Sequence, residues 1–124
     1  MLRVGIDLVQ VSRIRHAIER QGERFLLRIF TDEEREYCQK KKFPWPNYAV
    51  RFAAKEALFK SLLPETLPTL VWKEIGVVRH SSGAPSLIFS GSTQELLLEW
   101  KFTLSLTHTH ENAMAQVLAS PPVT

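Results

Sequence analysis

The sequence predicts a small single domain of the α+β class. Its 124 residues suffice for one hydrophobic core and are too few for two. A long helical segment, 48–62, occupies the middle of the chain, and two strands joined by a short loop close it. Hairpin-linked strands pair antiparallel, which distinguishes this pattern from alternating parallel units. We place the domain at residues 1–120, followed by a frayed tail at 121–124.

The N-terminal residues 2–9 predict a strand, because their side chains alternate with period two. One face carries Leu2, Val4, Ile6 and Leu8, and the other carries Arg3, Gly5, Asp7 and Val9. A helix at about 13–21 follows. We expect Ser12 to act as its N-cap and Gly22 to end it.

Two short helices precede a proline-containing loop. The first covers 25–30, and the second covers 31–40 and opens with the capping box T-D-E-E. The segment 41–47 (K-K-F-P-W-P-N) predicts a loop, because two prolines in three residues oppose a continuous helix. The long helix 48–62 then runs to a stop at Pro64.

The second half of the chain is predicted to be mostly strand. A turn with the sequence S-S-G-A-P joins the first two strands, and T-H-T-H-E-N joins the last two. The capping box S-T-Q-E indicates a helix at 92–100 between the two pairs. The expected strands are 71–79, 86–89, 102–107 and 114–118.

Composition favours a reduced, cytoplasmic protein. Cys38 is the single cysteine, so no intrachain disulfide can form. Arg3 and Asp7 interrupt any signal-peptide core, and no apolar run approaches the roughly 20 residues that span a membrane. The net charge of +3 suits an acidic partner or a phosphate-rich ligand without choosing between them. The arginines at 13–28 can equally form a solvated helix face.

Glu56, Lys60 and Asp7 carry the strongest chemical signal. Helical spacing puts Glu56 and Lys60 on one stripe beside two small alanines. A surface ion pair between them is the structural alternative. Asp7 lies in an apolar strand and needs a cation, several N–H donors or a metal, and a salt bridge would satisfy it as well. Two carboxylates with a nearby lysine suit Mg²⁺ and phosphate.

His108 is a weaker candidate. It shares a strand face with Phe102, Leu104 and Leu106, where a satisfied core histidine is the common alternative. A zinc site is not expected, because His108 and His110 lack a third ligand. No glycine-rich phosphate loop or nucleophile elbow is present.

Four segments together resemble the holo-acyl-carrier-protein synthases among the 4′-phosphopantetheinyl transferases. They occur in the family's order and spacing: V-G-I-D-L-V-Q-V-S-R-I, R-F-L-L-R-I-F-T-D-E-E, R-F-A-A-K-E-A-L-F-K and L-S-L-T-H-T-H-E-N-A-M-A-Q-V. The resemblance implies an antiparallel sheet packed against the long central helix, and a homotrimer with sites between subunits. It implies transfer of phosphopantetheine from coenzyme A to a serine of apo acyl carrier protein, with Mg²⁺, in fatty acid and lipid biosynthesis.

The resemblance also assigns expected roles to residues. Asp7 and Glu56 match the family's metal ligands. Asp7, Glu56 and Lys60 match its catalytic positions. Those expected to bind coenzyme A are Arg51, Lys60, Pro85, His108 and Thr109. Those expected to dock the carrier protein are Arg13, Arg24 and Arg28.

One segment departs from the family pattern. Residues 61–68 read S-L-L-P-E-T-L-P where the family commonly has a glycine-rich G-T-G stretch. This difference supports the first alternative, a catalytically weak homologue that binds coenzyme A or a carrier protein. The second alternative is a basic nucleic-acid-binding module, which no motif here supports.

Overall fold

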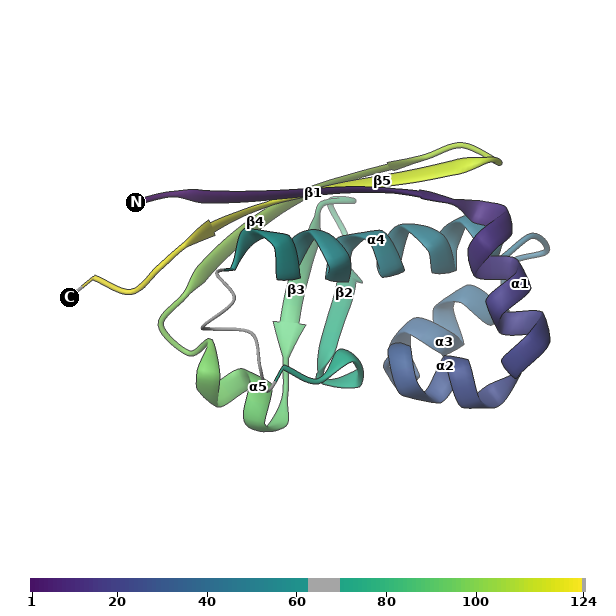
Figure 1. Ribbon diagram of the computed structural model, residues 1–124, viewed down its shortest axis with the longest axis horizontal. Helices are drawn as coiled ribbons and strands as arrows, with labels where there is room; N and C mark the ends of the chain where they lie inside the picture. The colour runs from purple at the N-terminus through teal and green to yellow at the C-terminus, as the bar shows by residue number, and fades with distance from the viewer. Residues whose placement is uncertain (63–69, 124) are drawn as a thin grey trace.

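The computed structural model describes residues 1–62 and 70–123 (Figure 1). The helices are α1 (Val11–Gln21), α2 (Glu23–Ile29), α3 (Asp32–Gln39), α4 (Trp45–Ser61), the 3₁₀ helix η2 (Trp72–Glu74) and α5 (Gly91–Leu96). The strands are β1 (Arg3–Gln10), β2 (Ile75–Arg79), β3 (Pro85–Phe89), β4 (Lys101–His108) and β5 (Asn112–Ser120). Within these described residues, no helix combines the length and apolarity needed to cross a membrane.

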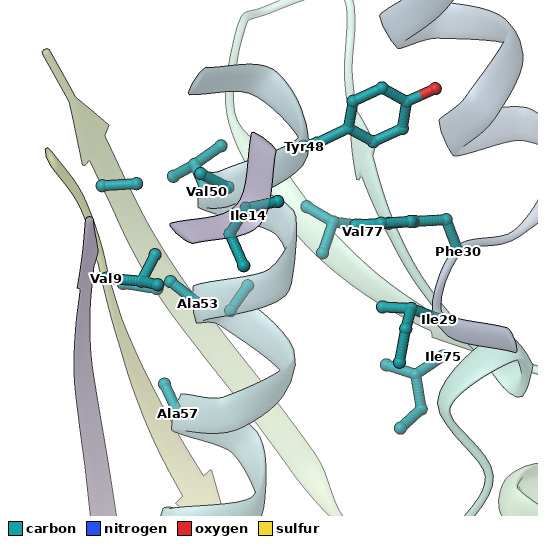
Figure 2. Packing of buried hydrophobic residues seen from close by; sticks show 14 of the residues in the cluster. Val9, Ile14, Ile29, Phe30, Tyr48, Val50, Ala53, Ala57, Ile75 and Val77 are labelled. Atoms are coloured by element: carbon teal, nitrogen blue, oxygen red, sulfur yellow. The ribbon is translucent and has the colours of Figure 1, made fainter. Parts of the chain in front are cut away.

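The long helix α4 is the centre of the molecule. One of its sides lies along the three-stranded sheet β1-β5-β4, in which each neighbouring pair is antiparallel. Its other side faces α2, α3 and the antiparallel ribbon β2-β3, and Figure 2 shows core side chains on both sides of the helix. The predicted α+β class, with an antiparallel sheet against a long central helix, is confirmed.

The alternation predicted for β1 is confirmed. Gly5 and Val9 are buried against α4, and Arg3 and Asp7 share that face half-buried. The opposite face is unusual, since its apolar side chains are more than half exposed: Leu2, Val4, Ile6 and Leu8. In a single chain, the sheet therefore turns its more apolar β1 face outward.

Two predicted N-caps are wrong, while the capping box of Thr31 and Glu34 at α3 is confirmed. Helix α1 begins at Val11, directly after β1, with Gln10 in the cap position and Ser12 inside the first turn. The N–H of Val11 donates instead to the carbonyl of Glu111, 2.9 Å away in the β4-β5 loop. A tertiary acceptor thus replaces the local cap.

The second predicted box, at 92–95, fails for a similar reason. Helix α5 begins at Gly91 and ends at Leu96, short of the predicted end at 100. The Ser92 hydroxyl donates to Glu74 Oε1 at 3.1 Å, and the Thr93 N–H and hydroxyl donate to the same oxygen at 3.0 and 2.8 Å. The carboxylate of Glu74 in η2 therefore caps α5 from outside.

The predicted loop 41–47 ends too late, because α4 already begins at Trp45. Pro46 lies in the first turn, where its missing N–H has no intrahelical partner to lose. The predicted strand 71–79 is shorter than expected, since η2 occupies its start and β2 covers only its second half. The predicted stop at Pro64 lies outside the described residues.

Gly5 sets the distance between β1 and α4. A Cβ atom at this position would lie 1.9 Å from the carbonyl oxygen of Ala57 and 2.6 Å from the backbone nitrogen of Ser61. Both are backbone atoms of the helix, so no side chain can move aside. The helix therefore packs this closely on the sheet only because residue 5 has no side chain.

Gly5→Ala is expected to lower the free energy of unfolding by about 3 kcal/mol or more, because β1 and α4 must separate. Gly76→Ala is the matched control, since the nearest atoms to its Cβ belong to the side chains of Ile88 at 3.1 Å and Thr31 at 3.4 Å, and it should cost about 1 kcal/mol. Urea unfolding at one fixed protein concentration measures both values. Equal losses in the two variants would contradict the assigned role of Gly5.

Cys38 is a buried free thiol in α3. Burial, the largest cause, raises the pKa of Cys38 from 9.0 to about 12, so that the thiol stays neutral at pH 8. Because the thiolate is the reactive form, the folded protein should not react with Ellman's reagent at pH 8 within minutes. Unfolding in guanidinium should then release one reactive thiol per chain. Rapid reaction of the folded protein would contradict this environment.

Candidate functional site

Asp7, Glu56 and Lys60 come together where β1 crosses α4. The ammonium of Lys60 donates to Asp7 Oδ1 at 3.0 Å and to the carbonyl of Ile6 at 3.2 Å. The Asp7 side chain is 13% exposed, whereas that of Lys60 is 54% exposed. Lys60 thus forms its ion pair with Asp7, across two elements, instead of the considered pair with Glu56 one turn earlier.

Asp7 and Glu56 line one cleft of about 380 Å³. Arg13 of α1 lines the same cleft, so two carboxylates and a guanidinium surround it. The rest of the wall is mostly apolar: Leu8, Val9, Ile14, Ala17, Phe25 and Phe52. The lining of the cleft therefore combines charged groups with apolar side chains that can contact aliphatic groups.

The two carboxylates repel one another. Burial raises the pKa of Glu56, the negative charge of Asp7 raises it further, and Lys60 opposes the shift. A single ammonium thus serves two neighbouring carboxylates. Two neighbouring carboxylates offer the oxygen ligands that a hard divalent cation such as Mg²⁺ prefers. Within residues 1–62 and 70–123 no group of three metal-ligating side chains forms, so phosphate oxygens and water would have to complete the coordination shell.

Arg51 lies on a different side of α4 and lines a second, smaller cleft of about 190 Å³. Its side chain is 4% exposed, donates through Nη1 to the carbonyl of Asn47 at 3.1 Å and stacks 4.5 Å from the ring centre of Tyr37. Arg79 lines the same cleft. The structure therefore does not bring Arg51 into the cleft of Asp7 and Glu56.

His108 and Thr109 lie at the β4-β5 turn. His108 is exposed at the end of β4, opposite Ala113, so the alternative of a satisfied core histidine is wrong. The Thr109 hydroxyl accepts hydrogen bonds from the N–H groups of Glu111 and Asn112 at 3.2 and 3.1 Å. Pro85 opens β3 opposite Arg79.

The three arginines proposed for docking are all exposed and lie on α1 and α2. Arg13 lines the cleft of the two carboxylates. Arg24 and Arg28 line a shallow groove of about 360 Å³ together with Leu27, Val71 and Lys73. A basic and apolar surface thus extends from the carboxylate cleft along the first two helices.

Sequence reasoning missed a buried ion pair between Glu34 and Lys55. Lys55 is fully buried and Glu34 is 2% exposed, and their closest charged atoms lie 2.6 Å apart. Glu34 was predicted only as the acidic member of a capping box. The signal that could have revealed Lys55 is its place among small apolar residues, A-A-K-E-A-L, in the middle of a core helix.

Comparisons with known proteins agree with the fold and its sequence motifs. A family model for the 4′-phosphopantetheinyl transferase superfamily matches residues 3–117. The chain is 40% identical over 120 residues to a holo-[acyl-carrier-protein] synthase from Chloroherpeton thalassium, covering 97% of this chain and 98% of that protein. It is 39% identical over 119 residues to one from Chlamydia pneumoniae, covering 96% and 97%.

Solved structures of holo-[acyl-carrier-protein] synthases also have the fold of this chain. The holo-[acyl-carrier-protein] synthase of Neisseria meningitidis superposes with a TM-score of 0.83 at 26% identity, covering 96% of this chain and 98% of that one. The enzyme of Bacillus anthracis in complex with coenzyme A (3′,5′-ADP) superposes with a TM-score of 0.73 at 31% identity, covering 94% of each chain. Because sequence, fold and motifs agree over nearly the whole length, this chain belongs to the holo-acyl-carrier-protein synthases of the 4′-phosphopantetheinyl transferase superfamily.

Proposed function

We propose that this protein transfers the 4′-phosphopantetheine group of coenzyme A to a serine of apo acyl carrier protein. The products are holo acyl carrier protein and adenosine 3′,5′-bisphosphate, which places the protein in fatty acid and lipid biosynthesis. The observation that carries the proposal is the meeting of Asp7 and Glu56 at one cleft, with Lys60 paired to Asp7, in a chain of this family. A free, buried Cys38 further supports the proposed cytoplasmic location.

Asp7 and Glu56 are the residues proposed to hold Mg²⁺. When bound, Mg²⁺ supplies positive charge that neutralises the pyrophosphate of coenzyme A. Lys60 is the mobile partner of this pair, because its half-exposed ammonium can turn from Asp7 to a phosphate oxygen. Both roles use positive charge to stabilise negative charge on phosphate during the transfer.

Glu56 is the proposed acceptor of the serine proton. The serine oxygen attacks the β-phosphorus, the pyrophosphate P–O bond breaks, and adenosine 3′,5′-bisphosphate leaves with the bond electrons. Glu56 lines the cleft beside Asp7, and its carboxylate offers an oxygen to which the serine proton can move. Arg13 lines the same cleft and can hold an acidic side chain of the carrier, while Arg24 and Arg28 extend this basic surface.

Arg51, Pro85, His108 and Thr109 are the proposed contacts for the nucleotide end of coenzyme A. Arg51 lies in the second cleft, away from the cleft of Asp7 and Glu56. One coenzyme A molecule must reach both the metal site at Asp7 and Glu56 and the nucleotide site at Arg51. Because these lie in separate clefts of one chain, we favour a binding site shared between neighbouring chains. We therefore propose a homotrimer in which the two groups of residues come from different chains.

The outer face of the three-stranded sheet supports this assembly. Three rows of paired residues cross it: Val4, Leu118 and Thr103; Ile6, Gln116 and Ser105; Leu8, Met114 and Thr107. The β1 side of this face is apolar and more than half exposed, and Met114 is 37% exposed. The apolar strip formed by Leu2, Val4, Ile6 and Leu8 is of a kind typical of an interface between subunits.

Asp7→Asn and Glu56→Gln are each expected to slow transfer by about a hundredfold or more, because each removes charge from the proposed metal site. The measurement is intact-mass spectrometry of apo acyl carrier protein with coenzyme A and Mg²⁺, scored as gain of one phosphopantetheine. Glu36→Gln, at an exposed carboxylate on α3, is the matched control and should transfer at the native rate. No gain with the native protein and several carriers would favour the binding-only homologue.

Ile6→Lys is expected to dissociate the trimer, because it puts a charge in the middle of the apolar strip. Light scattering should give about three times the chain mass of 14.2 kDa for the native protein and the mass of one chain for the variant. Leu98→Lys replaces a leucine that is 72% exposed and outside the sheet, and it should leave the native mass unchanged. A trimeric Ile6→Lys protein would place the interface elsewhere.

A further inference from the structure

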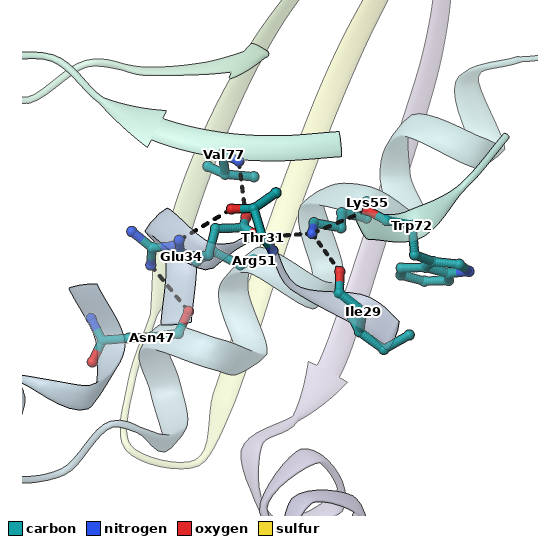
Figure 3. A network of polar contacts seen from close by, with 8 residues as sticks. All are labelled: Ile29, Thr31, Glu34, Asn47, Arg51, Lys55, Trp72 and Val77. Carbon is teal, nitrogen blue, oxygen red and sulfur yellow. Dashed lines mark hydrogen bonds and ion pairs between the residues drawn. The ribbon is translucent and has the colours of Figure 1, made fainter. Parts of the chain in front are cut away.

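A buried ion pair joins α4 to the elements that form the second cleft. The ammonium of Lys55 donates to Glu34 Oε1 and to the carbonyl of Ile29, both at 2.6 Å, and lies 3.4 Å from the carbonyl of Trp72 (Figure 3). Glu34 Oε1 also accepts from the N–H of Thr31 at 2.9 Å. Both side chains are inaccessible to solvent, so the pair cannot itself bind a ligand.

Every acceptor oxygen of Glu34 is engaged. Oε1 accepts hydrogen bonds from the ammonium of Lys55 and the N–H of Thr31. Oε2 accepts one from the N–H of Val77 on β2 at 2.9 Å. The carboxylate therefore connects the start of α3, the middle of α4 and the β2-β3 ribbon. These same elements supply the wall of the second cleft, and Glu34 and Val77 belong to that wall directly.

Arg51 shares the cleft with Glu34 and keeps an unused donor. Its Nε is buried and finds no hydrogen-bond partner among the described residues, although the side chain is 4% exposed. A buried guanidinium beside a buried carboxylate would ordinarily pair with it. Here the carboxylate is already neutralised by Lys55, so the charge of Arg51 remains available to a molecule in the cleft.

We propose that Lys55 and Glu34 form a positioning pair for the nucleotide end of coenzyme A, in which Lys55 keeps Glu34 away from Arg51. The inference rests on the proposed function, because it takes the anion at Arg51 to be a phosphate of coenzyme A. Both side chains are sealed from solvent, although Glu34 lies in the wall of the cleft, so the pair is assigned no direct bond to that ligand. The pair acts in two ways. It fixes β2 against α3, and it prevents Arg51 from forming an ion pair with Glu34.

Burial energetics argue that stability alone does not explain the pair. Buried ion pairs are often no more stable than apolar side chains of similar volume, because both charges lose their hydration. The α3–α4 contact could therefore have been built from apolar side chains. A neutralised carboxylate next to an unpaired arginine is, by contrast, directly useful for holding an anion.

The test measures binding of adenosine 3′,5′-bisphosphate by calorimetry to the native protein and three variants. Lys55→Met should weaken binding at least tenfold, because the released carboxylate of Glu34 can pair with Arg51. Glu34→Gln should bind as tightly as the native protein or more tightly, since the competing negative charge is gone. The double variant Glu34→Gln, Lys55→Met should bind within threefold of the native protein. Light scattering and thermal unfolding are recorded for all four proteins.

The relative affinities of the four proteins for adenosine 3′,5′-bisphosphate show whether the pair positions Arg51 or only stabilises the fold. A structural pair predicts that both single variants bind more weakly, in proportion to their lost thermal stability, and that result would overturn the proposal. If Lys55→Met does not fold, Glu34→Gln and the double variant decide, and a loss of more than fivefold in either would overturn it. If the native protein itself does not bind the nucleotide, the proposed function fails, and the role of the pair fails with it.

Discussion

The close contact between β1 and α4 at Gly5 determines where the site lies. Because residue 5 has no Cβ, the backbone of Ala57 packs directly on the strand. Glu56 directly precedes Ala57 on the helix, and Lys60 lies three residues after it. Asp7 follows Gly5 by two residues and so lies on the same face of β1. The steric requirement of one glycine thus brings a strand carboxylate within 3.0 Å of a helix ammonium.

The same contact explains the orientation of the strand. Arg3, Gly5, Asp7 and Val9 must face α4 if Gly5 is to touch it, and the alternation of the strand then turns the other four side chains outward. A face of Leu2, Val4, Ile6 and Leu8 would normally be the core face. The polar site and the exposed apolar strip are therefore two consequences of one register. Moving the strand by one residue would bury the strip and remove Asp7 from the cleft.

Local signals in the sequence predicted much of this fold, and tertiary partners account for the main errors. The capping box at Thr31 was predictable because both of its partners lie within four residues. Ser12 and Ser92 looked equally suitable, but Glu111 and Glu74 satisfy those helix starts from distant segments. Helical spacing placed Glu56 and Lys60 on one stripe, yet it could not show that Lys60 would turn to Asp7, 53 residues away. Lys55 was missed because its partner Glu34 lies 21 residues earlier, and contacts at that separation leave no periodicity.

The buried ion pair and the charged residues at the two clefts differ in whether each charge has a partner of opposite sign, and this difference fits different roles. Glu34 and Lys55 pair with one another and are sealed from solvent. The pair therefore holds α3 against α4 and carries no net charge. Asp7 and Glu56 lie close to one another and to a single, half-exposed lysine, and they face a cleft that Arg13 also lines. Arg51 is the converse case, a buried positive group whose Nε is unpaired among the described residues. These groups face the two clefts, and they are the ones that we propose to bind ligands: the carboxylates a cation with pyrophosphate, and Arg51 a phosphate. Lys55 lies between Arg51 and Glu56 in the sequence of α4, and its buried pairing with Glu34 on α3 means that the pair adds no net charge to either cleft.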